Sequence, residues 1–293
     1  VGEAKETDLL YKWQAQAFPK TPPTKLRKHI WQSPITLVGH YAEQDAILPL
    51  KIIEKQWPML AQQELLDVYC MECGLIPLLT EMREKGISID LPKTLEFREW
   101  LISDISQSQA ELNSIAGKEI NADSSNEIAA FCDTIGVKYP RTEAGNASIK
   151  NDWLKKQTGH HFELIKDLRE KAKILSTFIE GYFLGSSVNS KIHATFHPLK
   201  GEGGGTITGR FSSSDPNLQN VPARSELGKR IRELVVPDIG HETMWVGDYS
   251  QIEYLNLAHF AVGAGAEEVR QQYRDDPSTD YHTFTQQLVY KMT

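Results

Sequence analysis

The string Asp248-Tyr-Ser-Gln-Ile-Glu253 holds two carboxylates five positions apart. We expect a strand over 244–247 to end at Asp248 and a helix to begin almost at once, because Ser250 and Glu253 have the S-x-x-E spacing of a capping box. A carboxylate at a strand end beside a helix N-terminus suits a divalent cation, which prefers oxygen ligands. The alternative is a solvated Asp248 at a turn and a Glu253 that only caps its helix. Spacing alone leaves both interpretations open.

Two groups of polar side chains precede this string. The amides that follow Pro216 are Asn217, Gln219 and Asn220, and the cations further on are Lys229, Arg230 and Arg232. Amides after a proline can simply form a turn, or they can reach phosphates and minor-groove acceptors. The cations can form a solvated face or contact a phosphate backbone.

Two further motifs lack the partners that a binding site needs. The glycines Gly201 and Gly203-Gly-Gly205 fit neither phosphate-loop pattern and precede a strand pattern, so they predict a hairpin turn. Cys70-Met-Glu-Cys73 has no second Cys or His pair at zinc spacing and lies in a helical apolar pattern, so we expect both cysteines to pack in a core.

Composition is typical of a globular protein of about two domains, with 40% hydrophobic and 24% charged residues in 293. No run of 18 or more apolar residues predicts a membrane span. A net charge of −7 argues weakly against nucleic-acid binding, although local Lys and Arg placement decides that affinity. The odd number of cysteines, three, fits a reducing compartment, and we expect a cytoplasmic protein. The sequence has no initiator Met and stops inside an apolar helical pattern, so we expect both ends to be truncated.

The elements that would position these residues are mostly helical. Expected helices cover 41–57 with a boundary at Pro58, 63–85 capped by Gly86, 92–115, the run after Asp123, 162–183, 251–262 and 280–292. A loop is expected over 138–150. Short strands are expected over 192–196, 206–211 and 244–247, with the glycine turn between the first two. This pattern indicates an α+β fold with a helical majority.

Several blocks in order resemble family A DNA polymerases, the group of bacterial DNA polymerase I and its phage relatives. Residues 206–222, TITGRFSSSDPNLQNVP, are similar to the family's T-x-T-G-R-L-S-S-x-x-P-N-L-Q-N-I-P block. Residues 192–199 are similar to the phage form of the preceding strand, and 228–232 to the G-x-x-I-R that follows. The string 248–253 matches the family's metal-binding motif. The resemblance therefore runs in family order from 192 to 253.

Weaker similarity extends to both sides. Glu72, Pro77, Gly86 and Asp90 fit the opening of the polymerase region, and Arg169, Lys173, Ser176 and Thr177 fit the thumb's R-x-x-x-K-x-x-S-T stretch. Residues 280–283, DYHT, are similar to the family's D-I-H-T. Tyr41 and Asp45 resemble the last proofreading exonuclease motif, Y-x-x-x-D, whose spacing puts both side chains on one helix face.

The resemblance implies a role for each matching residue. The catalytic residues would be Asp248, which bridges two metal ions, Tyr249, whose backbone carbonyl binds one, and Glu253, which excludes a ribose 2′-hydroxyl. Incoming dNTP would meet Ser250, Gln251, Ile252 and His282. DNA would contact Lys173, Thr206, Thr208, Arg210, Ser212, Ser213, Asn217, Gln219, Asn220 and Arg232. In the exonuclease remnant, Tyr41 would orient water and Asp45 would hold a metal.

The resemblance also implies three domains. Residues 1–62 would be the end of a 3′-5′ exonuclease domain, 63–190 the lead-in helix and helical thumb, and 191–293 the N-terminal part of an antiparallel palm sheet. The fingers, the rest of the palm and the second catalytic Asp would lie beyond Thr293. The sequence departs from the family after Glu253, where Tyr254-Leu255 stands in place of an apolar residue and Arg.

The implied function is DNA-directed DNA synthesis, in which a primer 3′-hydroxyl attacks a dNTP, with two Mg²⁺ ions or Mn²⁺ in their place. Expected partners are primer–template DNA and dNTPs, with no membrane. Because one carboxylate cannot hold two ions, we expect the isolated chain to be inactive. Two alternatives remain: one half of a split polymerase completed by a second chain, and a non-catalytic DNA-binding module.

Overall fold

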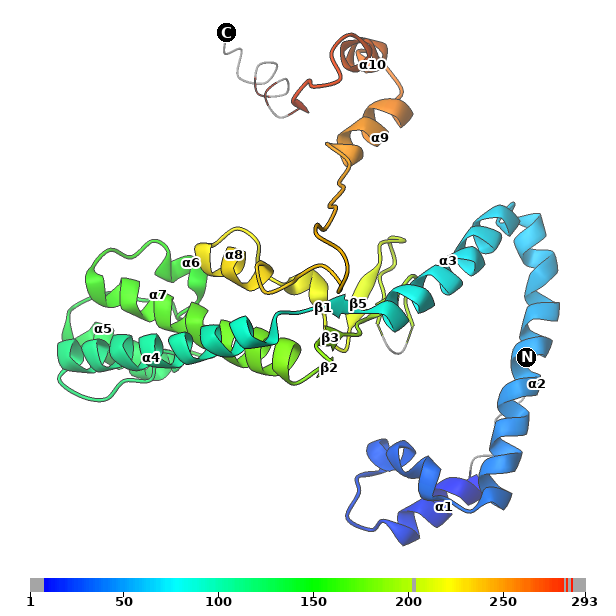
Figure 1. Cartoon of the computed structure of the whole chain (residues 1–293), viewed down its shortest axis with the longest axis horizontal. Helices are drawn as coiled ribbons and strands as arrows, with labels where there is room; N and C mark the ends of the chain where they lie inside the picture. The colour runs from blue at the N-terminus through cyan, green and yellow to red at the C-terminus, as the bar shows by residue number, and fades with distance from the viewer. Residues whose placement is uncertain (1–7, 202–203, 282, 284–285, 287–293) are drawn as a thin grey trace. The chain divides into compact units, whose positions relative to one another are not determined.

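The computed structural model describes residues 8–201, 204–281, 283 and 286. The chain divides into two compact units, Val1–Val235 and Val236–Thr293. Helices make up most of the described residues, and the strands form small antiparallel sheets (Figure 1). The α+β class with a helical majority is therefore confirmed. In the described part of the chain, no helix combines the length and the apolar character that crossing a bilayer requires.

The first elements are α1 (Asp8–Ala17), η1 (Pro23–Gln32) and α2 (Ile35–Gln62). α1 packs on η1, and Leu10 and Leu26 are their buried apolar residues. The side chain of Gln14 is also buried, and its amide donates to Ser33 Oγ at 2.9 Å. A polar contact therefore joins α1 to the end of η1 inside this small cluster.

Helix α2 does not end at Pro58, so the boundary expected there is wrong. Both Pro49 and Pro58 lie inside the helix, which continues to Gln62. Each proline removes one backbone hydrogen bond. Because α2 has no buried residue, water can reach the carbonyl that each proline leaves without a donor.

Helix α3 (Leu66–Lys85) ends at Gly86, as predicted. Gly86 has a φ of 65°, in the left-handed region that favours glycine at a helix end. The expectation of core packing for Cys70 and Cys73 is wrong, because both are exposed. Leu79 is the buried residue of α3, and the two cysteines lie on parts of the helix that no described element covers.

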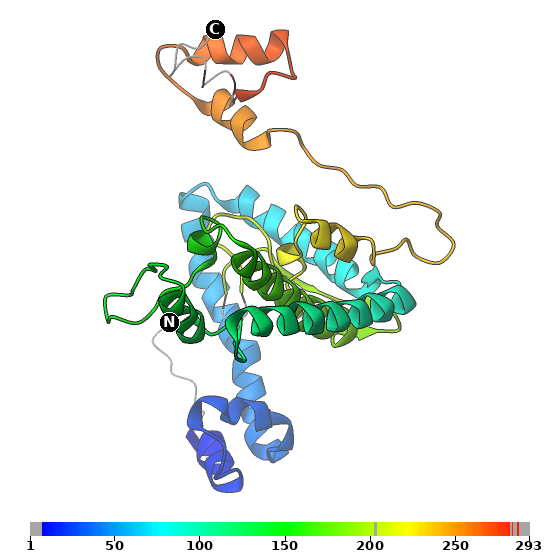
Figure 2. The same ribbon diagram turned by 90° about the vertical axis from the view of Figure 1, so that its left-hand side faces the viewer.

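A helical bundle follows, formed by α4 (Leu91–Ala116), α7 (His160–Lys173) and η2 (Ile174–Leu184), which we call the α4–η2 bundle. The three elements pack on one another, and α4 lies beside α7 in both views (Figures 1 and 2). α4 begins as the sequence predicts, because Asp90 accepts a hydrogen bond from Lys93 N at 2.9 Å and caps the first turn.

Two apolar clusters hold the bundle together. One lies where the C-terminal part of α4 meets the N-terminal part of α7, and α5 (Ser125–Thr134) and α6 (Asn151–Leu154) also contribute to it. It includes Leu112, Ile128, Phe131, Leu154, Phe162 and Ile165. The other includes Phe97, Leu101, Ile174, Phe178, Ile179, Phe183, Ile192 and Ile231. The helix expected after Asp123 is present as α5, and Ser124 caps it by accepting from Glu127 N at 3.3 Å.

η2 is a π-helix of 11 residues that continues α7 directly. Its buried residues are Ile174, Phe178, Ile179 and Phe183, which are spaced by four, one and four positions. Hydrogen bonds that run from i to i+5 bring residues four and five apart to the same face. The wider helix thus turns this run of apolar side chains into one core-facing stripe.

An ion cluster joins α4 to α7. Lys171, with 12% of its side chain exposed, pairs with Asp104 on α4 and with Asp167 at 2.5 Å on its own helix. Burial alone would lower the pKa of Lys171, but hydrogen bonds and charge from the two aspartates outweigh it and raise the pKa. Lys171 is therefore a charged cross-link rather than a surface cation.

Two small sheets are formed by strands that precede and follow the bundle in the chain. The first has the strand order β1-β3-β2, from Ile87–Ser88, Lys191–Ile192 and Ser187–Val188, all antiparallel. The second pairs β4 (Thr195–His197) with β5 (Ser212–Ser214). After β5 come η3 (Leu218–Asn220) and α8 (Glu226–Arg232).

The second unit contains α9 (Ile252–Phe260) and α10 (Ala266–Asp275). The sequence did not predict α10. Arg270 of α10 donates to the carbonyls of Ala258, at 3.2 Å, and Ala261, at 2.9 Å, and so satisfies the C-terminal end of α9. The two helices are thus joined through one guanidinium group.

Candidate nucleic-acid interface

The segment that carries Asp248 is extended and exposed. The strand expected over 244–247 is absent, which is a correction to the prediction. Val246 and Tyr249 are 84% and 79% exposed, and Asp248 is exposed as well. A strand needs a neighbour for its backbone hydrogen bonds, and no described residue pairs with this segment.

The start of α9 also differs from the prediction. The helix begins at Ile252, and the cap position is held by Gln251 in a left-handed conformation with a φ of 53°, so the Ser250–Glu253 capping box does not form. The Gln251 side chain donates to Thr279 O at 3.0 Å and accepts from Tyr281 N at 3.2 Å. These two bonds offset the cost of the left-handed backbone, which is about 1–2 kcal/mol.

Gln251 thereby joins two motifs predicted to meet the incoming nucleotide. Its partners lie in the segment that contains the DYHT sequence, and the rings of Tyr254 and Tyr281 stack at 4.7 Å. Asp280 caps the following turn by accepting from Thr283 N at 3.2 Å. His282, the residue predicted to touch the triphosphate, lies outside the described residues.

The described glycines agree with the predicted hairpin turn, but the second strand is displaced. Gly201 and Gly204 pair across the turn, and a Cβ on Gly205 would lie 2.0 Å from Leu199 O, so only glycine fits there. The strand expected over 206–211 begins instead at Ser212. Residues 206–210 form a local loop, in which Thr206 Oγ1 donates to Arg210 O at 2.7 Å.

Several side chains predicted to contact DNA are engaged within this loop and the β4–β5 hairpin. Ser212 Oγ accepts from Gly205 N at 2.7 Å, and the buried Ser213 donates to Pro216 O at 3.1 Å. Asn217 caps η3 by accepting from Gln219 N at 3.1 Å. These bonds fix the hairpin, and their roles toward DNA stay predictions.

The cations of α8 divide into engaged and available groups. Arg230 stacks over Phe97 at 4.4 Å and over Trp100 at 4.0 Å, and Lys229 pairs with a neighbouring glutamate on its own helix. Arg232 is exposed and forms no ion pair within the part of the chain that the structure describes. Of the three, Arg232 is thus the one free to meet a phosphate.

Tyr41 and Asp45 lie one turn apart on α2, as the Y-x-x-x-D spacing predicts, and both are partly buried. Among the described residues, neither they nor Asp248 lies in a group of three potential metal ligands. Among the described residues, no three His, Cys, Asp or Glu side chains come together in a group that could hold a metal ion. The described residues therefore do not fit a two-ion centre on their own.

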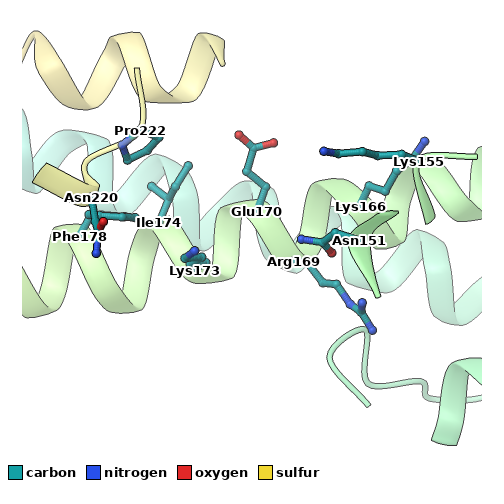
Figure 3. Close-up of a pocket in the computed structure, with 10 residues that line it drawn as sticks. All are labelled: Asn151, Lys155, Lys166, Arg169, Glu170, Lys173, Ile174, Phe178, Asn220 and Pro222. Atoms are coloured by element: carbon teal, nitrogen blue, oxygen red, sulfur yellow. The ribbon is translucent and has the colours of Figure 1, made fainter. Parts of the chain in front are cut away.

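A cleft of about 380 Å³ lies along α7 (Figure 3). Its lining is Asn151, Lys155, Lys166, Arg169, Glu170, Lys173, Ile174, Phe178, Asn220 and Pro222. Two predicted DNA contacts, Lys173 and Asn220, are brought together in it although they lie 47 positions apart in the sequence. Four cations against one carboxylate make the cleft strongly positive in a chain whose net charge is negative.

Arg169 shapes one wall of this cleft. Its guanidinium donates to Ala122 O at 2.6 Å and to Ile149 O at 2.8 Å. Burial lowers the pKa of Arg169, an effect that the nearby charge of Asp123 partly offsets. Arg169 therefore fastens two loops to α7.

Three lining residues, Asn151, Lys155 and Lys166, belong to none of the motifs found in the sequence. A signal for part of this set is present, because Lys166, Arg169 and Lys173 follow the i, i+3, i+7 spacing that places residues on one helix face. No local pattern could place Lys155 beside them, since it reaches the cleft from the end of α6.

Comparison with known proteins agrees with these observations. Residues 93–293 match the family described as DNA polymerase family A. The chain is 32% identical over 277 residues to a DNA-directed DNA polymerase of Pseudomonas phage M6, covering 87% of this chain and 41% of that protein. It is 29% identical over 310 residues to DNA polymerase DpoZ of Salmonella phage PMBT28, covering 99% of this chain and 48% of that protein.

Bacterial relatives match as well. DNA polymerase I of Bacillus subtilis (strain 168) is 31% identical over 224 residues, covering 75% of this chain and 24% of that protein. A solved structure, the POL domain of Pol1 from M. smegmatis in complex with DNA primer-template and dNTP, has a TM-score of 0.60 at 28% identity. It covers 73% of this chain and 37% of that one.

The chain spans less than half the length of these curated relatives. The family match nevertheless covers most of the chain, from the first turn of α4 onward. It includes every block between 192 and 253 on which the sequence resemblance rests. This chain belongs to DNA polymerase family A.

Proposed function

We propose that this chain is part of a DNA-directed DNA polymerase and that it grips primer–template DNA beside the position of the incoming dNTP. The observation that carries the proposal is the family match over residues 93–293. The cleft along α7 supports it, because it gathers cations and two amides from separate elements on one accessible face. Clustered cations are what a phosphate backbone requires.

Within this proposal, residues 1–62 are the end of a proofreading exonuclease domain, 63–190 the thumb and 191–293 part of the palm. The Thr206–Arg232 region contacts the primer–template, and Gln251 and the DYHT segment meet the dNTP. The bonds between Gln251 and residues 279 and 281 support this last assignment, because they hold the two segments together.

Family A DNA polymerases generally use divalent metal ions, for which Mg²⁺ is the proposed ion and Asp248 the proposed ligand. Asp248 and Glu253 are both exposed, and neither lies in a group of three potential ligands among the described residues. Catalysis would therefore need ligands beyond the described residues, from a longer chain or from a second chain.

Primer extension separates the catalytic proposal from its alternative. The purified chain is expected not to extend a primer, because one carboxylate cannot hold the two ions of such a site. It is still expected to bind primer–template DNA, with an affinity that falls steeply as salt rises. Sustained Mg²⁺-dependent synthesis that is lost in Asp248→Ala would overturn the first expectation.

A binding experiment tests the grip itself. Arg210→Ala is expected to weaken primer–template binding to a similar degree for different sequences, because a phosphate contact carries no sequence information. Fluorescence anisotropy with two unrelated primer–templates measures this. An affinity that does not change between low and high salt would refute the proposed grip.

The alternative of a non-catalytic DNA-binding module is favoured by the same absence of a ligand group among the described residues. A complementation experiment distinguishes the DNA-binding module from a split polymerase. The chain is mixed with a polypeptide that carries the fingers and remaining palm of a relative. Restored synthesis would support the split polymerase, whereas unchanged binding without synthesis would support the module.

A further inference from the structure

The C-x-x-C pair of α3 has no part in the proposed function. Cys70 and Cys73 lie three positions apart on this helix, and both are exposed. The third cysteine, Cys132, is completely buried in the apolar cluster that α5 shares with the α4–η2 bundle. Because a thiol must meet solvent to react with a dissolved compound, the two accessible thiols of the chain are neighbours on one helix.

The two thiols lie close together. Positions i and i+3 of an α-helix are about 5 Å apart between Cα atoms, and a disulfide requires a Cα separation of about 4.4–6.8 Å. The Tyr69 hydroxyl gives a second indication. Its pKa is raised first by a hydrogen bond with Cys73, and then by the charge of Cys73, by burial and by the charge of Cys70. Both thiols therefore lie near the same hydroxyl.

The pair lacks the further ligands that a structural zinc site needs. Such a site takes four ligands, most often cysteine and histidine. Within the described ranges of the chain, no three His, Cys, Asp or Glu side chains gather into a group that could hold a metal ion. Two neighbouring thiols without other metal ligands are suited instead to a reaction with each other.

Pro77 removes an obstacle to closing a disulfide inside this helix. The Cβ atoms of residues i and i+3 are about 5–6 Å apart in a helix, whereas a disulfide needs about 3.5–4.5 Å, so the backbone must shift. Residue 77 of a regular helix would donate its N–H to the Cys73 carbonyl, but a proline has no N–H to donate. The peptide group that follows Cys73 can therefore tilt without breaking a hydrogen bond to that carbonyl.

We propose that Cys70 and Cys73 form a reversible disulfide by exchange with a low-molecular-weight disulfide, and that Pro77 is a positioning residue for this reaction. One exposed thiolate attacks a sulfur of the small disulfide, displaces one small thiolate and forms a mixed disulfide. The other thiolate attacks the protein sulfur of that mixed disulfide, forms the Cys70–Cys73 bond and releases the second small thiolate. The two protein thiols thus lose two protons and two electrons, and the small disulfide takes them up as two thiols.

Mass spectrometry of the folded chain after incubation with glutathione disulfide tests this reaction. The wild-type chain should lose two hydrogens and carry no glutathione, whereas Cys70→Ser and Cys73→Ser should each carry one glutathione. Dithiothreitol should reverse both products. Cys132→Ala, which keeps only the two exposed thiols, must give the same internal disulfide as the wild type. A wild-type chain that keeps both thiols, carries glutathione on each of them or forms a disulfide with a second chain would overturn the proposal.

A proline variant tests the role of the helix backbone. Pro77→Ala restores the hydrogen bond to the Cys73 carbonyl, so the equilibrium constant for disulfide formation against glutathione should fall about three- to tenfold. Pro49→Ala is the matched control, because Pro49 lies inside α2 and away from both cysteines in the sequence, and its constant should equal that of the wild type. Equal constants for the two proline variants would overturn the role of Pro77. None of these measurements involves DNA, so their outcome is independent of the proposed function.

Discussion

The α4–η2 bundle and the segment around Asp248 differ in how much of the chain packs against them. Leu101 and Ile165 of the bundle are completely buried, whereas Val246 and Tyr249 beside Asp248 are 84% and 79% exposed. One apolar cluster of the bundle is formed by its own helices and the loops between them, and the other also takes Ile192 from β3 and Ile231 from α8. The Asp248 segment has a strand-like sequence and no described partner strand.

A specific sequence motif does not imply that the segment carrying it is well packed. The most specific motif of the chain lies in its least packed part, while the best packed part carries only weak motifs. Helices satisfy their backbone groups internally, but a strand depends on a neighbour. The helices therefore pair their backbone groups internally, whereas the Asp248 segment has no partner strand among the described residues.

The largest expected effect tests this contrast directly. Ile165→Ala should lower the free energy of unfolding by about 2–5 kcal/mol, because it removes buried methyl groups and leaves a cavity. Val246→Ala, a similar truncation in the exposed segment, should change it by no more than about 0.5 kcal/mol. Urea unfolding followed by circular dichroism measures both. Equal losses would show that the Asp248 segment is packed after all.

A second prediction sharpens the contrast within α7. Lys171→Met should cost about 1–3 kcal/mol, because it leaves the carboxylates of Asp104 and Asp167 close together without their cation. The two aspartates are 29% and 38% exposed, and water therefore screens part of that repulsion. Lys173→Met, in the cleft, is the matched control and should be nearly neutral. A loss from Lys173→Met as large as that from Lys171→Met would contradict the division into paired and available lysines.

A third comparison uses two arginines of α8. Arg230→Ala should lower stability by about 0.5–1 kcal/mol through loss of its stacking on Phe97 and Trp100, and it should leave the salt slope of DNA binding unchanged. Arg232→Ala should do the reverse, with unchanged stability and a slope reduced by about one. Paired unfolding and binding measurements on each variant decide the matter. Reversal of the two results would exchange the structural and binding roles.

The smallest expected effect concerns pH. Burial first, and then the charge of His160, lower the pKa of His161 below its ordinary value of 6.5. The unfolded chain then takes up its proton at a higher pH than the folded chain does. This contribution to stability is therefore complete above about pH 6.5 and is lost as pH falls through 6.5 toward the folded pKa.

His161→Phe should flatten that part of the stability profile, because a phenylalanine ring does not titrate and can pack against Phe131 and Phe162 as the His161 ring does. Thermal unfolding between mildly acidic and neutral pH follows the change. A variant whose Tm falls with acid as steeply as that of the wild type would exclude His161 as the titrating group.

Much of the helical part could be predicted from the sequence, for identifiable reasons. Asp90 and Ser124 are side-chain caps, and Gly86 ends its helix, so local chemistry marks those boundaries. The boundary at Pro58 was wrong because a proline in an exposed helix costs less than one in a packed helix. Cys70 and Cys73 have a core-like spacing, but spacing does not reveal whether another element covers the helix.

The candidate site was predictable as a set of residues but not as an arrangement. The block 206–222 and the string 248–253 identified the family, which the comparisons then confirmed. The structure gave what the sequence lacked: Gln251 in place of the Ser250 cap, and Lys155 beside Lys166. Both depend on contacts between residues distant in the chain, which no local pattern encodes.

The π-helical stretch has a consequence for how this chain tolerates change. Along η2 the core-facing residues recur every four to five positions, because a π-helix has more residues per turn than the α-helix α7 before it. Deleting one residue while the helix keeps its hydrogen-bond pattern would rotate all that follows by roughly 80–100° relative to α7. A single-codon deletion in η2 would therefore change the orientation of the strands that follow it more than it would change the length of the segment.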